Sequence, residues 1–199
     1  INNTAKDLIF DGAGVDGAIS QHYGQDSYYK VITEVSDATF RVINNRGGDV
    51  RLNGDVTTME FEAIWNGAKG DLTQAGGKTL RTDSIIISNA ASVGSAGAPL
   101  NISTLPEAPM RFEGVENLHL RAVLRLTGPA RIELTEFAVS GELDLELVGE
   151  SDNLYLVDVA FDALHAANIS LRLGKGMSLV DADNDGGLDI EATGNASIY

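Results

Sequence analysis

The amino-acid sequence predicts an all-β protein, folded as a right-handed parallel β-helix. Apolar and polar residues alternate with a period of two in many segments, which places the apolar side chains on one face of an extended strand. Clusters of Gly, Asn, Asp and Ser separate these segments, and 22 glycines against four prolines indicate many tight turns. No segment carries a sustained apolar stripe at helical spacing, so no long helix is expected.

The predicted strands are clearest in the C-terminal half. Apolar and polar residues alternate there at 118–121, 124–126, 131–135, 142–147, 169–173 and 188–192. The N-terminal half carries the same pattern more loosely, at 40–42, 50–52 and 59–63. Residues 84–88 contain three consecutive isoleucines, as expected of a more deeply buried strand.

The spacing of the predicted strands leaves two all-β architectures open. In the C-terminal half the strands begin about every 9 to 15 residues, which suits an antiparallel β-sandwich. Every second strand begins about every 19 to 26 residues, which suits the coils of a parallel β-helix. At roughly 20 residues per coil, we expect eight to ten coils.

The chain divides into an N-terminal cap or arm (1–38) and a β-solenoid domain (39–199). The first segment differs from the rest in composition. Its residues 11–17 are typical of a glycine-rich loop, and several tyrosines follow them. Such a segment could cover the open end of a solenoid. It could also be an arm that pairs with a neighbouring chain, or a plain surface loop.

Composition excludes several classes of function. The net charge of −15 makes nucleic acid and anionic membrane surfaces poor partners. The absence of cysteine removes disulfides, thiolate metal sites and cysteine nucleophiles. No apolar run is long enough for a transmembrane helix. The chain begins with Ile1 and shows no signal peptide, so we expect a processed chain or a fragment.

The sharpest chemical motif is the acidic run 181–189. Three aspartates at alternate positions, followed by glycine, match the first half of a calcium-binding loop, where oxygen ligands converge on a hard cation. The expected metal ligands are Asp181, Asp183, Asp185, Gly187 and Asp189. The twelfth position is Ala192 in place of the usual acid, so we expect weak affinity, on the order of 10⁻⁴–10⁻³ M. An acidic turn between two strands is the alternative.

Two stretches resemble known families. Residues 92–102, Ser-Val-Gly-Ser-Ala-Gly-Ala-Pro-Leu-Asn-Ile, resemble the coil repeats of filamentous-haemagglutinin-like exoproteins, the secreted substrates of two-partner secretion. This resemblance is best over 47–103 and looser over 112–197. It favours the parallel β-helix over the β-sandwich, which the strand spacing alone does not decide, and it implies a bacterial adhesin, either secreted or held at the cell surface. The acidic run is similar to the loops of thrombospondin-type and dockerin-type modules, which implies calcium as a cofactor.

These features favour a non-catalytic structural or adhesive module of a bacterial cell-surface or secreted protein, serving adhesion, biofilm matrix or display. The expected partners are a host or neighbouring-cell surface, polysaccharide or another protein, with self-assembly as a further route. Neither nucleic acid binding nor membrane insertion is expected. One alternative is a β-sandwich subunit of an extracellular filament assembled by strand exchange.

A second alternative is a polysaccharide-acting enzyme on a β-helix scaffold. The acids that could line its catalytic face are Asp144, Glu146, Glu133 and Asp158. Outward acids are ordinary solubilising residues, and the chain carries no known catalytic signature, so we expect no enzyme activity. His119 stands between two leucines of an alternating segment and is predicted to be a solvated surface side chain.

Overall fold

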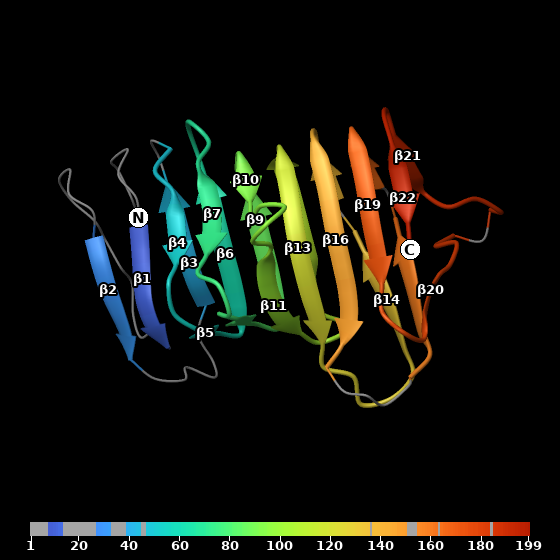
Figure 1. Cartoon of the computed structure of the whole chain (residues 1–199), viewed down its shortest axis with the longest axis horizontal. Helices are drawn as coiled ribbons and strands as arrows, with labels where there is room; N and C mark the ends of the chain where they lie inside the picture. Colours follow the sequence, from blue (N-terminus) through green and yellow to red (C-terminus); the bar gives the residue numbers. More distant parts are fainter. Residues whose placement is uncertain are drawn as a thin grey trace.

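A computed structural model describes residues 8–13, 27–32, 39–44, 47–135, 137–150, 155–162, 164–183 and 185–199. These residues form a parallel β-helix of about six turns, with strands and no helix among the described residues (Figure 1). The coils turn in the right-handed sense along the long axis. The predicted fold class is confirmed. The antiparallel β-sandwich is wrong, because each strand pairs in parallel with its equivalent one coil away.

Three sheets form the sides of the coil. The large sheet holds twelve strands: β1 (Leu8–Ala13), β2 (Ser27–Ile32), β4 (Val50–Leu52), β5 (Val56–Thr57), β7 (Asp71–Gln74), β8 (Leu80–Arg81), β10 (Ser92–Val93), β11 (Leu100–Thr104), β13 (Asn117–Leu124), β16 (Glu142–Gly149), β19 (Asn168–Leu173) and β22 (Ala196–Ile198). The second sheet holds β3 (Thr39–Asn44), β6 (Glu60–Trp65), β9 (Ser84–Ser88), β12 (Met110–Val115), β15 (Phe137–Val139), β18 (Leu164–Ala166) and β21 (Ile190–Ala192). The short sheet holds β14 (Ala130–Leu134), β17 (Val157–Phe161) and β20 (Met177–Leu179).

The coils are longer and fewer than the sequence pattern predicts. In the second sheet Thr39 lies opposite Glu60, whereas Phe137 lies opposite Leu164, so the coils lengthen toward the C-terminus. The expectation of eight to ten coils is therefore wrong, since there are about six turns. Alternation marks only the strands. The loops between the strands supply the additional residues of each coil.

The core is a set of side-chain columns that run along the axis of the coil. Three buried rings from three successive coils form what we call the aromatic column. Phe112 and Phe137 lie opposite each other in the second sheet with ring centroids 5.0 Å apart, and Phe161 of the short sheet places its ring edge-on, 6.1 Å from that of Phe137. The three isoleucines of β9 also alternate. Two of them are fully buried, whereas Ile86 faces outward and is partly exposed. The three consecutive isoleucines had predicted a strand buried on both faces. This prediction is wrong, because only one face of β9 is fully buried.

The large sheet continues into the N-terminal segment. Strand β1 pairs in parallel with β4 on one side and with β2 on the other, so β2 is the outer strand. No break in this sheet marks the predicted boundary between residues 38 and 39. Residues 1–7, 14–26 and 33–38 lie outside the described residues, so the assignment of 1–38 as a cap or an arm stays a prediction.

In each coil, a polar side chain lies where the chain enters its strand of the large sheet, and these side chains form a column along the axis. We call this set the turn column, and it comprises Asp49, Asp71, Ser92, Asn117, Glu142, Asn168 and Asn195. Side-chain oxygens of several of its members accept hydrogen bonds from the backbone N–H of the next coil. Asn117 Oδ1 accepts from Glu142 at 3.1 Å, and Asn168 Oδ1 accepts from Asn195 at 3.1 Å. The column thus joins coils along the axis.

Glycine precedes the turn column at positions where the neighbouring coil leaves no room for a Cβ atom. A Cβ atom on Gly141 would lie 2.5 Å from Asn117 Oδ1, and one on Gly194 would lie 2.7 Å from Asn168 Oδ1. Real Cβ atoms essentially never come so close to another heavy atom. The small residue is therefore required by the hydrogen-bonding side chain of the preceding coil.

We expect the substitution Asp71→Asn to stabilise the protein at neutral pH. Burial and the negative charges of Asp49 and Glu116 raise the pKa of Asp71, although the Ser92 N–H opposes this shift. The folded state therefore carries ionised Asp71 at a cost that appears as pH rises through its raised pKa. Asparagine removes the charge and keeps an oxygen for the Ser92 N–H. The urea midpoint should rise at pH 7, with the gain vanishing below the ordinary aspartate pKa of about 4.

The matched control is Asp55→Asn. Asp55 Oδ1 also accepts a backbone hydrogen bond from the next coil, from Thr79 N–H at 2.9 Å. Its carboxylate lies 3.6 Å from Lys78 Nζ, so the substitution removes an attraction and should give no gain. A fall in stability for Asp71→Asn at pH 7 would contradict the account of Asp71.

Candidate functional site

The large sheet changes shape at β13, and the change creates a step on its outer surface. In the preceding coils the sheet is split, with loops between β4 and β5, β7 and β8, and β10 and β11. The last of these loops is a hairpin in which Ser95 and Ala98 exchange backbone hydrogen bonds of 3.0 Å. Strands β13 and β16 then run without interruption. The hairpin therefore stands beside uninterrupted strands.

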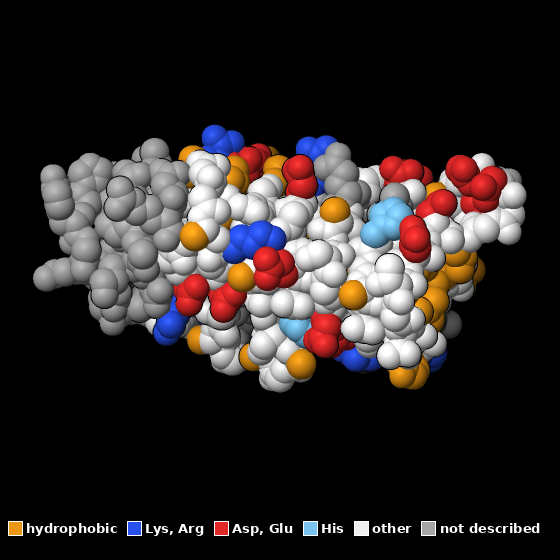
Figure 2. All heavy atoms as spheres, turned by 90° about the horizontal axis from the view of Figure 1, so that it is seen from above, with side chains coloured by type: hydrophobic (Ala, Val, Ile, Leu, Met, Phe, Trp, Pro, Cys, Tyr) orange, Lys and Arg blue, Asp and Glu red, His pale blue; other side chains and the backbone are white. Residues whose placement is uncertain are grey.

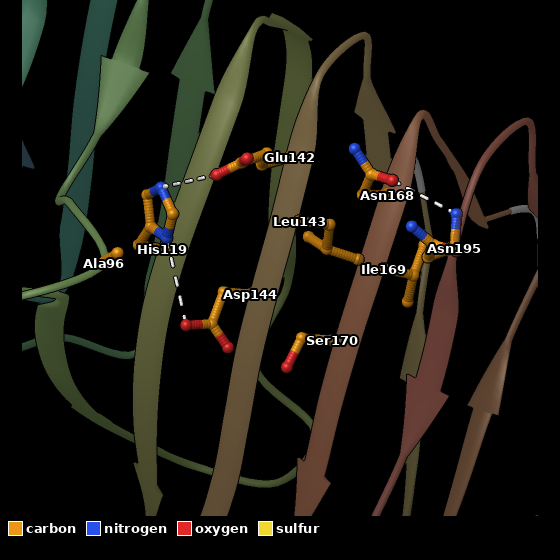
Figure 3. A pocket seen from close by; sticks show the side chains of 9 residues that line it. All are labelled: Ala96, His119, Glu142, Leu143, Asp144, Asn168, Ile169, Ser170 and Asn195. Atoms are coloured by element: carbon orange, nitrogen blue, oxygen red, sulfur yellow. Dashed lines mark hydrogen bonds and ion pairs between the residues drawn. The ribbon is translucent and has the colours of Figure 1, made fainter.

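A hollow of about 410 Å³ lies at this step (Figure 3). We call it the lateral hollow. Its lining residues are Ala96, His119, Glu142, Leu143, Asp144, Asn168, Ile169, Ser170 and Asn195. The first comes from the hairpin and most others come from β13, β16 and β19, so the hollow crosses several coils. The sequence pattern alone did not identify this set.

His119 lies between two carboxylates at the floor of the lateral hollow. Its Nε2 is 4.0 Å from Glu142 Oε2, and its Nδ1 is 3.9 Å from Asp144 Oδ2 (Figure 3). The imidazole side chain is only 9% exposed, so the prediction of a solvated surface histidine is wrong. Neighbouring coils cover this outward position. Among the described residues, Nδ1 has no hydrogen-bond partner.

The two carboxylates beside His119 differ in their surroundings. Asp144 is 22% exposed and accepts a 2.7 Å hydrogen bond from Arg172 Nη2 on the next coil. Glu142 is 64% exposed, and among the described basic side chains only that of His119 lies within 4.0 Å of its carboxylate. Glu142 is therefore the more available acceptor for a bound molecule.

The arrangement does not form a serine nucleophile. Ser170 lies opposite Asp144, and Asp144 lies opposite His119 on adjacent strands. Two strand spacings, roughly 9–10 Å, therefore separate Ser170 from His119. A serine activated by histidine needs a direct hydrogen bond between the two side chains. Proton transfer in the hollow would have to involve the carboxylates.

The four acids predicted to line a catalytic face are not brought together. Asp144 and Glu146 lie on β16 of the large sheet, where Glu146 pairs with Arg121 at 3.4 Å. Glu133 and Asp158 lie on β14 and β17 of the short sheet. Only Asp144 lines the lateral hollow. The carboxylate that accompanies it is Glu142, a turn-column residue that the prediction did not include.

The acidic loop 181–189 lies at the far end of the coil stack, where acidic side chains gather (Figure 2). One carboxylate oxygen each from Asp181, Asp183 and Asp189 lies within 4.8 Å of the others. Asp181 Oδ2 also accepts the Gly186 N–H at 2.7 Å, and this bond closes the loop. The structure thus brings together three of the five predicted ligands.

The other two predicted ligands lie in the same loop but outside this group of three. Asp185 Oδ1 accepts the Gly187 N–H at 2.9 Å. Desolvation and the charges of Asp183, Asp185 and Asp181 raise the pKa of Asp189, with a smaller effect from Asp162. Crowded carboxylates of this kind are the electrostatic condition that a bound cation would relieve.

The loop is fastened to the short sheet. Arg131 Nη2 donates a 3.1 Å hydrogen bond to the Ala182 carbonyl, and Arg131 Nε lies 3.0 Å from Glu133 Oε1. A second hollow of about 240 Å³ lies beside it, lined in part by Glu133, Asp162 and Asp183. The loop therefore faces further acids of the coil surface.

Comparison with known proteins gives no family for this chain. No protein-family model matches it, and neither a curated protein nor a solved structure matches it. The described residues contain no helix with the length and hydropathy that a membrane span requires. The features that define the chain are its parallel β-helix, the lateral hollow and the acidic loop. The resemblance to filamentous-haemagglutinin-like exoproteins stays a prediction.

Proposed function

We propose that the chain is a non-catalytic structural and adhesive module of a bacterial cell-surface or secreted protein. This proposal rests on one observation: the contacts that hold the protein together run from coil to coil, along the long axis. Backbone ladders, core columns and the turn column all connect one coil to the next along the long axis. Such a stack makes a stiff rod whose sides stay available for contact.

The charge of the molecule supports a role in an aqueous, extracellular setting. The net charge of −15 favours solubility, because copies of the chain repel one another and so resist aggregation. The expected partners are polysaccharide, protein or another cell surface, with nucleic acid and membrane insertion excluded from the proposal.

An adsorption experiment tests this function. The purified chain is mixed with intact bacterial cells and with insoluble polysaccharides, which are then sedimented, and a soluble acidic protein of similar charge serves as the control. We expect the chain in the pellet and no reducing or unsaturated sugar ends in the supernatant. If the chain stays in the supernatant with every type of cell and polysaccharide, the proposed adhesive role is contradicted.

A polysaccharide-acting enzyme is the second candidate. The placement of His119 between the Glu142 and Asp144 carboxylates favours it, because paired acids beside a sugar are the usual catalytic groups of glycosidases. Release of sugar ends in the adsorption experiment, abolished by Glu142→Gln, would replace the non-catalytic proposal with this one.

Calcium at the acidic loop is part of the same proposal. With a dissociation constant of about 10⁻⁴–10⁻³ M, calcium at roughly 10⁻² M should stabilise the folded state by about 1.4–2.7 kcal/mol. We expect the melting midpoint to rise by roughly 3–10 °C relative to a chelator. The double substitution Asp183→Asn and Asp189→Asn should remove this increment, as measured by far-UV circular dichroism.

The control for calcium is Glu113→Gln. Glu113 is an exposed acid on β12 in the second sheet, outside the acidic loop. This variant should keep the full calcium increment. Equal melting midpoints in calcium and chelator for the unsubstituted chain would reduce the loop to an acidic turn.

A further inference from the structure

Polar side chains repeat once per coil across the floor of the lateral hollow. His119, Asp144 and Ser170 occupy register-matched positions on β13, β16 and β19. Beside them runs the C-terminal part of the turn column, with Glu142, Asn168 and Asn195 (Figure 3). The hollow is therefore floored by two parallel columns of hydrogen-bonding groups.

The interval between equivalent groups is set by the fold. Neighbouring strands of a sheet lie about 4.8 Å apart, so each column offers a polar group at about that interval along the axis. An extended β-1,4-linked sugar chain advances by a closely similar distance per ring. Consecutive rings are turned over, so each edge of the chain carries the vicinal hydroxyls of one ring and the hydroxymethyl group of the next. A linear chain of this kind lying along the axis between the two columns would meet a polar side chain at each of its edges on every ring.

The groups in the two columns suit hydroxyls. Glu142 supplies a largely exposed carboxylate that accepts hydrogen bonds. Asn168 uses its Oδ1 for the Asn195 N–H, and its amide NH₂ has no partner among the described residues. Ser170 supplies a hydroxyl that can both donate and accept. Vicinal hydroxyls on one sugar ring need this mixture of acceptors and donors.

The charge of the hollow selects against acidic sugars. Glu142 and Asp144 contribute two carboxylates, and Arg172 is the cation paired directly with one of them. The net charge of −15 adds long-range repulsion of polyanions. A polycation would find acceptors in the hollow but would leave the amide and hydroxyl donors unpaired.

We propose that the lateral hollow binds a neutral, extended β-1,4-linked oligosaccharide. About three rings lie across the coils of β13, β16 and β19, and the hairpin at Ala96 borders one end of the hollow. This inference rests on the proposed adhesive function and gives the chemical class of its ligand.

The test is a titration of the ¹⁵N-labelled full chain followed by two-dimensional NMR. The probes are cellohexaose and β-1,4-mannohexaose, with α-1,4-linked maltohexaose, hexagalacturonate and a glucosamine hexamer as comparisons. We expect at least one β-1,4 neutral hexamer to shift the amide signals of residues 119, 142, 144, 168 and 170. Its affinity should exceed that of maltohexaose by about tenfold or more.

Variants locate the binding. Glu142→Ala and Ser170→Ala should each weaken the β-1,4 hexamer by about tenfold, while Glu113→Ala on the second sheet should leave affinity unchanged. The backbone N–H of Glu142 keeps its bond to Asn117 in the first variant, so the fold is retained. No shift with either β-1,4 neutral hexamer at millimolar concentration overturns the proposal. Equal binding of maltohexaose, or binding of the glucosamine hexamer alone, overturns it as well.

The outcome separates this inference from the adhesive function. The chain could adsorb to cells or insoluble polysaccharide although no neutral hexamer binds in the lateral hollow. In that case it adheres through another surface, and only the present inference is overturned. A chain that neither adsorbs nor binds would overturn both.

Discussion

Replacing Phe137 by alanine should lower the free energy of unfolding by roughly 3–5 kcal/mol. Phe137 is fully buried, and its ring lies between those of Phe112, at 5.0 Å, and Phe161, at 6.1 Å. The truncation leaves a cavity in the middle of a column that three successive coils share. Because backbone ladders hold the strand of Phe137 to a strand on each side, the cavity has little freedom to collapse.

Phe137→Leu provides the graded comparison. It keeps much of the volume and all of the apolar character, so we expect about half of the alanine loss or less. Urea unfolding monitored by circular dichroism gives both values. A loss below about 1 kcal/mol for alanine would show that the aromatic column does not hold the coils together. If the alanine variant does not fold, the leucine variant still reports on the column.

The second large effect is expected from Gly141→Ala. The added methyl group would lie 2.5 Å from Asn117 Oδ1 and 2.8 Å from the Glu116 carbonyl oxygen. To make room, the coils must separate or Asn117 must give up its hydrogen bond to the Glu142 N–H. We expect a loss of about 1–3 kcal/mol in unfolding free energy, as is typical of overpacking at a rigid site.

Gly128→Ala is its matched control. A Cβ atom at Gly128 would meet nothing within 4 Å, and the backbone there is not in the left-handed region. This variant should be unchanged or gain about 0.4–1 kcal/mol, since alanine has fewer conformations than glycine in the unfolded chain. If both variants lost the same amount, close approach of the coils would not explain the glycine at 141.

The alternation of residues 142–147 predicted β16 closely, because one face of that strand is buried and the other faces solvent. Alternation describes a single strand and its two faces. It does not say whether the next strand runs parallel or antiparallel, which is why the β-sandwich stayed open. The pairing was also encoded in the turn column, where a small residue precedes a polar one at Gly70–Asp71 and Ala167–Asn168.

The two candidate sites differ in how far the sequence could reveal them. The acidic loop is local, so the spacing of its aspartates placed Asp181 and Asp183 together without knowledge of the fold. The lateral hollow is assembled from residues about one coil apart, such as His119 and Asp144. Burial of His119 depends on neighbouring coils, and the length of each coil had to be known before those neighbours could be named.

The in-register columns bear on how such a molecule changes its length during evolution. Removing residues 117–141 would join Glu116 to Glu142 and bring Leu143 to the place of Leu118, where it fits the same column. Duplicating that segment would extend the rod by one strand spacing, about 4.8 Å. Gain or loss of a whole coil is therefore a mutation for which complementary contacts already exist. Insertions of a few residues, in contrast, are accommodated only in the loops.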